Sequence, residues 1–188
     1  AERMTAQVRG LNMATKNAND GLAMLATIEN ATNDVTDMLQ RVRELAVQAA
    51  NDTNSATDRG YLQKEVDSLL NEINRVASQT VYNDLNVLDG TRSGTIQVGT
   101  DAGQTVAFSI AAIDTDTLGL TNDSFTDAAT IDDISAETAA TSATLASGEK
   151  ISVLTAADAA NSLTKITSAI ESVASNRAGY GALSNRLE

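Results

Sequence analysis

The feature that most constrains this chain is an apolar seam that runs along residues 3–49. In the second part of that segment, apolar or small side chains recur in alternating steps of four and three residues, at Met24, Ile28, Ala31, Val35, Met38, Val42, Leu45 and Ala49. A second row runs beside the first, at Leu25, Thr32, Leu39 and Ala46. This period is typical of an α-helix, and two adjacent rows suit a helix that packs among several neighbours. We therefore expect one long central helix on which the rest of the chain packs.

Three other segments complete the expected architecture. The polar run at 51–55 predicts a turn, and residues 56–79 repeat the apolar spacing, which predicts a second helix antiparallel to the first. Alternating side chains at 95–98 and 105–110 predict a β-hairpin. A last helix is expected to begin near Thr155, whose hydroxyl can cap it. Its apolar residues are seven apart, at Ile166, Val173, Tyr180 and Leu187.

These elements predict a mainly α fold with a small β part: an elongated antiparallel bundle of long helices, a β-hairpin and a small variable lobe that is α/β or irregular. We expect residues 1–113 to form the N-terminal part of the rod and residues 150–188 to complete it. Residues 114–149, rich in Asp, Thr, Ala and Ser, are expected to form the lobe or a partly mobile loop. Because both terminal helical patterns reach the chain ends unbroken, we expect a trimmed fragment whose termini lie side by side.

Charge and composition exclude several classes of function. The net charge is −12, and residues 101–149 hold 9 acidic residues and no basic one. A nucleic-acid partner or an anionic membrane is therefore not expected, because both require clustered Lys and Arg. No stretch approaches the ~20 apolar residues that span a bilayer. The chain has no Cys and no His, which removes structural zinc sites and Cys/His catalytic pairs, so we expect neither a cofactor nor catalysis.

One acidic stretch imitates the start of a calcium-binding loop. Asp114, Asp116 and Gly119 occupy its first, third and sixth positions. The fifth position is Leu118, however, and the twelfth is Phe125, where a bidentate Glu is required. We expect an acidic, solvated loop here and no metal site.

Parts of the sequence resemble the bacterial flagellin family. They are ERMTAQVRGLNMATKNANDG at 2–21, LQRVRELAVQ at 39–48 with the residues that follow it to 88, and ITSAIESVASNRAGYGALSNRLE at 166–188. The resemblance implies an extracellular subunit of the flagellar filament, whose helical rod packs against other flagellin subunits while a variable lobe faces outward. The terminal helices that line the inner tube of such filaments are missing here, which implies that the fragment stays monomeric.

Flagellins with this central run are similar to those sensed by vertebrate Toll-like receptor 5. The resemblance places that family's receptor-contact residues on Arg41, Leu45 and Glu65, the first two being one helical turn apart. The residue pattern alone predicts something plainer. Leu45 lies on the heptad line and is expected in the core, and Arg41 is expected to pair with Asp37 or Glu44 at the surface.

A second class of function is a cell-surface adhesin. Some flagellin-like proteins bind polysaccharide, and the variable lobe is the natural place for that, but residues 101–149 offer no basic side chain to hold an acidic glycan. A third class is a zinc protease, which certain flagellins carry in their variable region. It needs an H-E-x-x-H pair that a chain without histidine cannot supply. The sequence therefore favours a structural, self-assembling subunit.

Overall fold

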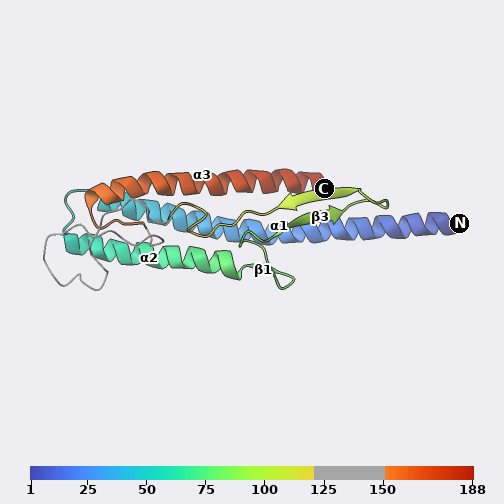
Figure 1. Ribbon diagram of the computed structural model, residues 1–188, viewed down its shortest axis with the longest axis horizontal. Coiled ribbons are helices and arrows are strands. Elements are labelled where there is room, and N and C mark those ends of the chain that lie inside the picture. The colour runs from blue at the N-terminus through green and yellow to red at the C-terminus, as the bar shows by residue number, and fades with distance from the viewer. Residues whose placement is uncertain (121–150) are drawn as a thin grey trace.

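The computed structural model describes residues 1–120 and 151–188. Within these ranges, three long helices lie along one axis (Figure 1): α1 spans Glu2–Ala49, α2 spans Ala56–Gln79 and α3 spans Ala156–Leu187. Both α2 and α3 run antiparallel to α1 and pack on it (Figure 1). At 1.5 Å per residue, the 48 residues of α1 extend over about 70 Å. The predicted helices and the mainly α fold class are confirmed.

Side-chain caps fix where the helices begin. The Ser55 hydroxyl accepts a hydrogen bond from the Asp58 backbone N–H at 3.1 Å, and the Asp58 carboxylate accepts one from the Ser55 N–H at 2.9 Å. This reciprocal capping box starts α2. Arg59 donates through Nε to the carbonyl of Ala49 at 2.8 Å, satisfying an otherwise unpaired group at the end of α1. Thr155 caps α3 as predicted, accepting from the Asp158 N–H at 3.0 Å.

The core follows the seam of α1. All three helices contribute deeply buried apolar side chains: Ile28, Val35, Leu39, Val42 and Leu45 from α1, Val66, Leu70 and Ile73 from α2, and Ile166, Ala169 and Val173 from α3. The connecting segments add Val87, Leu88, Ile113, Leu120, Ile151 and Val153, which are fully buried as well. Burial of each Leu, Ile or Val contributes about 1.5–3 kcal/mol to the stability of the folded state. Such a core, built almost without aromatic side chains, depends on close meshing of small residues along the length of the rod.

The first turns of α1 differ from the expectation of a seam buried along its whole length. Met4, Val8 and Leu11 continue the apolar rhythm, yet their side chains are 70%, 56% and 56% exposed. In Figure 1 this part of α1 extends beyond the ends of both α2 and α3. The apolar period therefore predicted the helix correctly. Within the described residues, however, the first buried side chain of α1 is Ala14.

The predicted β-hairpin is confirmed and contacts both of the longest helices, α1 and α3. Strand β3 (Ser93–Gln97) pairs antiparallel with β4 (Thr105–Ser109), with Thr95 opposite Ala107. The hairpin lies between α1 and α3 (Figure 1). Gly21 lets it come close, because a Cβ at that position would lie 2.5 Å from Cδ1 of Ile96. The Asn17 amide also donates to the carbonyl of Gln97 at 3.1 Å.

A second, smaller hairpin precedes the first. Strand β1 (Val81–Tyr82) pairs with β2 (Leu85–Asn86), where the sequence pattern predicted only a loop. Its two turn residues, Asn83 and Asp84, have φ values of 50° and 60°. Asn and Asp tolerate this left-handed conformation better than most residues, and two such residues in succession form the tight turn that suits a hairpin.

The chain leaves and re-enters the rod at one place. The Ile151 N–H donates to the carbonyl of Leu120 at 3.2 Å, which closes the ends of the segment between them. Leu118 and Leu120 are buried in the same core as the helices, although the sequence placed them in a lobe beginning at residue 114. The division of the chain at 113 and 149 stays a prediction, since most of that stretch lies outside the described residues.

Candidate functional site

The fold brings together two of the three residues to which the resemblance assigns receptor contact. Arg41 of α1 donates through Nε to Oε1 of Glu65 on α2 at 2.9 Å, and its Nη2 lies 2.8 Å from the same oxygen. On its own helix, Arg41 Nη1 lies 3.1 Å from Oε2 of Glu44. Of the two helix partners that the sequence offered for Arg41, the structure places Glu44, not Asp37, in contact with the guanidinium.

This cluster, Arg41 with Glu44 and Glu65, is exposed to solvent. The side chains of Arg41 and Glu65 are 48% and 45% exposed. Hydrogen bonds from Arg41 to Glu44 and then to Glu65 raise the pKa of Arg41 above its ordinary value, so the guanidinium stays charged. Exposed ion pairs are screened by water and salt and add little stability. Their effect here is to hold a cation and two carboxylates in a fixed arrangement on the surface.

Leu45, the third residue, is buried. Its side chain is only 1% exposed and belongs to the core of the rod. The expectation from the heptad line, that Leu45 packs inward, is therefore confirmed. A partner that approaches this face of the folded rod meets the charged cluster, while Leu45 supports the helix beneath it. The signal for this was already in the sequence, since Leu45 lies on the same seam as Val42 and Ala49.

The start of the calcium-like loop is used for structure. Oδ1 of Asp114 accepts from the Thr117 N–H at 2.7 Å, which closes a local turn, and Leu118 is buried. Thr115 is held by Oδ1 of Asn74, which accepts from its N–H at 2.9 Å. Phe125 lies outside the described residues. Within the part of the chain that the structure covers, no cluster of three or more His, Cys, Asp or Glu side chains could hold a metal ion.

Tyr180 ties α3 to the segment that follows β4. Its hydroxyl accepts a hydrogen bond from the Ala111 N–H at 3.2 Å, and its ring is buried. Burial raises the pKa of the Tyr180 hydroxyl, and the hydrogen bond from Ala111 opposes the shift in part. Tyr180 is therefore a structural tie across the rod, in keeping with its predicted place on the seam of the last helix.

Comparison with known proteins begins with the N-terminal half. The sequence model of the bacterial flagellin N-terminal helical region matches residues 1–93, which covers α1, α2 and the small hairpin. Flagellin 1 of Proteus mirabilis is 46% identical over 131 residues, 69% of this chain and 36% of that protein. The chain belongs to the bacterial flagellin family. Flagellin of Salmonella typhimurium strain LT2 is 48% identical over 120 residues, which is 64% of this flagellin chain and 24% of the relative.

Solved structures agree with this family assignment. The crystal structure of Bacillus cereus flagellin superposes with a TM-score of 0.70 and 28% identity, over 92% of this chain and 85% of that one. FliC from Burkholderia pseudomallei gives a TM-score of 0.69 at 23% identity, over 88% of this chain and 99% of that one, and shows the fold alone. This flagellin chain thus spans about a third or less of the curated relatives' length, and most of the two solved chains.

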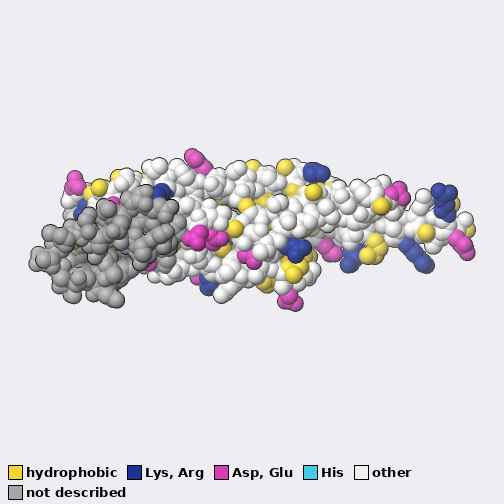
Figure 2. Space-filling model, viewed as in Figure 1, with side chains coloured by type: hydrophobic (Ala, Val, Ile, Leu, Met, Phe, Trp, Pro, Cys, Tyr) yellow, Lys and Arg dark blue, Asp and Glu magenta, His cyan; other side chains and the backbone are white. Residues whose placement is uncertain are grey.

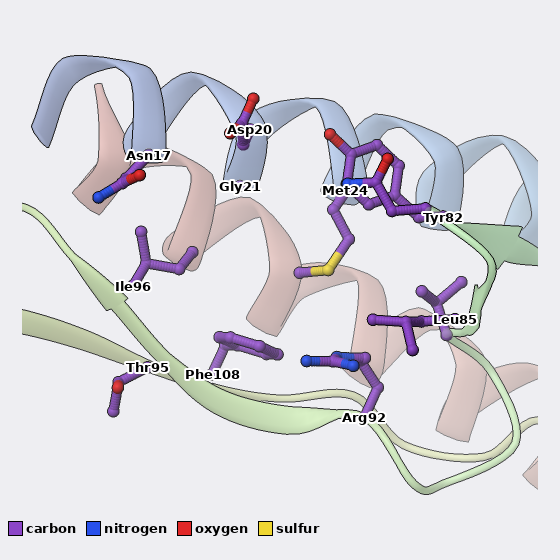
Figure 3. Close-up of a pocket in the computed structure, with 12 residues that line it drawn as sticks. Asn17, Asp20, Gly21, Met24, Tyr82, Leu85, Arg92, Thr95, Ile96 and Phe108 are labelled. Atoms are coloured by element: carbon purple, nitrogen blue, oxygen red, sulfur yellow. The ribbon is translucent and has the colours of Figure 1, made fainter. Parts of the chain in front are cut away.

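Among the described residues of this flagellin chain, no helix has both the length and the apolar character needed to cross a bilayer. Residue patterns also gave no sign of Arg92, a lone arginine before a short strand. Only the fold reveals that its guanidinium points into a hollow between α1 and the two hairpins (Figure 3). The stretch predicted as an adhesin lobe lies largely outside the described residues.

Proposed function

We propose that the parent protein of this chain is a structural subunit of the bacterial flagellar filament, outside the cell, with a mechanical and not a catalytic role. The observation that carries the proposal is the long helical rod itself, in a chain whose N-terminal half matches the flagellin family. A rod of three helices meshed along their length is stiff. Repetition of such rods side by side with other flagellin subunits would give a filament its strength in bending.

Exposed apolar side chains supply contact area for such packing. Large examples are 47–70% exposed: Met4, Val8, Leu11 and Met13 near the start of α1, Val47 and Tyr61 near the α1–α2 turn, and Val81 and Leu85 on the small hairpin. Figure 2 shows yellow side chains along the face in view, with charged side chains of both signs between them. Apolar surface bordered by charge is typical of surfaces that bind other proteins.

The test of this proposal is polymerisation of the parent protein. Electron microscopy of the purified full-length chain under polymerising conditions should show filaments. The 188-residue chain, expressed alone, should sediment as a monomer and serves as the comparison. A folded parent protein that forms no filaments, alone or on filament seeds, would contradict the proposal.

We further infer that the cluster Arg41, Glu44 and Glu65 forms a surface recognised by vertebrate Toll-like receptor 5. The inference rests on the flagellin resemblance of the run at 39–48 and is supported by the fixed, exposed position of Arg41 and Glu65. Arginine held in place at a surface is a frequent centre of protein–protein binding energy. Leu45 enters this proposal as the buried support of the helix and not as a contact.

Replacement of Arg41 tests that surface. Arg41→Ala should weaken binding to the receptor ectodomain about tenfold or more, measured by surface plasmon resonance, because the cation is lost from the middle of the cluster. Arg75→Ala is the matched control, since Arg75 is also an exposed arginine that pairs with a glutamate on its own helix, Glu72. Equal affinity of wild type and Arg41→Ala, or no binding by wild type, would refute the inference.

A further inference from the structure

An open hollow of about 370 Å³ lies between α1 and the two hairpins (Figure 3). This volume falls within the range of about 300–1,000 Å³ that is usual for small-molecule sites. Much of the lining is apolar: α1 contributes Met24, the small hairpin contributes Leu85, and the larger hairpin contributes Ile96 and Phe108. The Leu85 side chain is 49% exposed, so the apolar lining can be reached from the solvent.

Arg92 gives this hollow a specific chemical character. In Figure 3 its guanidinium points into the space between Phe108 and Leu85, and its Cζ lies 5.9 Å from the centre of the Phe108 ring. Within the described parts of the chain, no ion pair includes Arg92. Its Nε is shielded from solvent and has no hydrogen-bond partner there. A ligand would therefore reach this unpaired cation through the two Nη groups.

The acidic side chain in the lining does not serve as the partner of Arg92. Asp20 lines the hollow, but its carboxylate lies 3.5 Å from Nζ of Lys16, one turn away on α1. In Figure 3 the Asp20 carboxylate points away from Arg92. The guanidinium is therefore free to bind an anion, and a carboxylate is well suited because its two oxygens match neighbouring N–H groups of the guanidinium.

The charge of the surroundings limits how many negative groups such a ligand can carry. The chain has a net charge of −12. Asp20 lies in the lining, and Asp84 follows the lining residue Asn83 in the turn of the small hairpin. A ligand with several carboxylates would be repelled by these groups, whereas a single carboxylate can pair with Arg92 and place nothing charged elsewhere. The charges therefore favour a monoanion.

The apolar part of the lining favours a flexible hydrocarbon chain behind that carboxylate. In Figure 3 the side chains of Met24 and Phe108 lie on opposite sides of the space into which Arg92 points. A methionine side chain is unbranched and adapts its shape to what it contacts. Hydrocarbon that is buried between Met24, Ile96 and Phe108 leaves water, which favours binding in proportion to the area covered.

We propose that the hollow around Arg92 is a binding site for a small monocarboxylate with an unbranched apolar chain, of the class of a medium-chain fatty acid. The carboxylate lies on the Nη groups of Arg92, and the chain packs against Met24, Ile96 and Phe108. The site is separate from the cluster Arg41, Glu44 and Glu65 and needs no second copy of the chain, so it goes beyond the proposed function.

Titration calorimetry of the 188-residue chain with octanoate tests the proposal. A ligand of this size should bind with a Kd on the order of 1 mM. Hexanoate, which is two methylenes shorter, should bind about tenfold more weakly. Octylammonium brings a like charge to Arg92, and octanedioate would bury a second carboxylate in the apolar lining. Each should bind at least about tenfold more weakly than octanoate.

Substitution of Arg92 tests the charged end of the site. Arg92→Gln should weaken octanoate binding about tenfold or more and remove the preference for octanoate over octylammonium. Arg92→Lys keeps the cation and should keep that preference. Arg43→Gln removes a charge from an exposed position of α1 that does not line the hollow, and it should bind octanoate as wild type does.

Substitution of Leu85 tests the apolar end. Leu85→Ser should weaken octanoate binding about threefold or more, because part of the lining is lost. Val81→Ser is the matched control, since Val81 is 47% exposed on the same hairpin but does not line the hollow. Both positions are exposed, so neither change removes a side chain from the core.

The outcomes decide whether the site exists. Octanoate binding that is lost in Arg92→Gln and weakened in Leu85→Ser, with both controls unchanged, supports it. No octanoate binding by wild type at roughly 10 mM, equal binding by Arg92→Gln, or octylammonium binding as tight as that of octanoate would overturn it. Circular dichroism melts establish that each variant folds. If Arg92→Gln does not, equal octanoate affinities of Leu85→Ser and Val81→Ser, or a missing preference for octanoate in wild type, would overturn the proposal.

Discussion

Gln63 shows how much of this rod depends on a single buried polar side chain. Its amide Nε2 donates to the carbonyl of Ile151 at 3.0 Å and to Oδ1 of Asp67 at 3.1 Å, while its Oε1 accepts from the Val153 N–H at 2.6 Å. The side chain is only 5% exposed. One glutamine thereby satisfies two backbone groups of the segment that leads into α3, which would otherwise be buried without partners.

Removal of that amide should be costly. Gln63→Leu keeps the approximate size of the side chain but leaves the Ile151 carbonyl and the Val153 N–H unpaired, so we expect a loss of about 2–4 kcal/mol in the free energy of unfolding. Urea denaturation followed by circular dichroism measures this. Gln48→Leu, at an exposed position of α1, makes the same chemical change and should alter stability by less than about 0.5 kcal/mol. Similar values for the two variants would contradict the role given to Gln63.

At the scale of the element, the start of α2 depends on the pair Ser55 and Asp58. Hydrogen bonds from the Ser55 backbone and side chain hold the pKa of Asp58 below its ordinary value of 3.8. A carboxyl group whose pKa is lowered by folding stabilises the folded state above its unfolded pKa, and this contribution disappears as the pH falls through the folded pKa. The carboxylate half of the capping box therefore stabilises α2 at neutral pH and loses that effect in acid, while the hydrogen bond to the Ser55 hydroxyl does not titrate.

Asp58→Asn tests the pH dependence of the cap. Near neutral pH the variant should melt at a lower temperature than wild type, because its neutral amide accepts the Ser55 hydrogen bond more weakly. The difference should shrink in strong acid, once the pH has fallen below the lowered pKa of Asp58 and the wild-type carboxyl group is itself protonated. Thermal melts at both pH values measure the two gaps. A gap that stays constant, or widens in acid, would show that the Asp58 charge does not contribute.

The helices and strands differ in how well they can be predicted from the sequence. The three long helices were predictable within one or two residues because apolar period, a polar turn and hydroxyl caps all agree along dozens of residues. The β1–β2 hairpin was missed because strands of two residues are too short to show alternation. The side-chain amide of Gln63 and the hollow at Arg92 were also missed. A glutamine on a helix and a lone arginine have no pattern, and their surroundings exist only once the chain is folded.

At the scale of the whole molecule, the rod and the segment between residues 120 and 151 meet at a narrow neck. Leu120 and Ile151 are joined by a backbone hydrogen bond, and Leu120 and Ile151 are both fully buried. Gln63 of α2 and Ser162 of α3 hold the segment that begins at Ile151, the Ser162 hydroxyl donating to the carbonyl of Ser152 at 2.7 Å. The two ends of that segment are therefore held in place by contacts among residues of the rod.

Two deletions locate the boundary of the rod. Replacement of residues 121–150 by a linker of about four glycines should leave the melting temperature within about 4 °C of that of wild type, because the ends to be joined are already in contact. Replacement of residues 114–150 removes Leu118 and Leu120 as well and should cost several kcal/mol, since each buried leucine contributes about 2–5 kcal/mol. Equal melting temperatures for the two deletions would place the boundary at 113, as the sequence alone suggested.

The contact between Leu120 and Ile151 also bears on how the chain tolerates insertions between these two residues. When Leu120 and Ile151 are held together, the entropic cost of closing a flexible loop between two such points rises only logarithmically with loop length. Each doubling of the length costs about 0.6 kcal/mol more. Changes of sequence or length between residues 120 and 151 should then have little effect on the folding of the rod, because the contacts of Leu120 and Ile151 with the core remain. A rod with fixed contacts and a segment of variable length can therefore belong to one polypeptide.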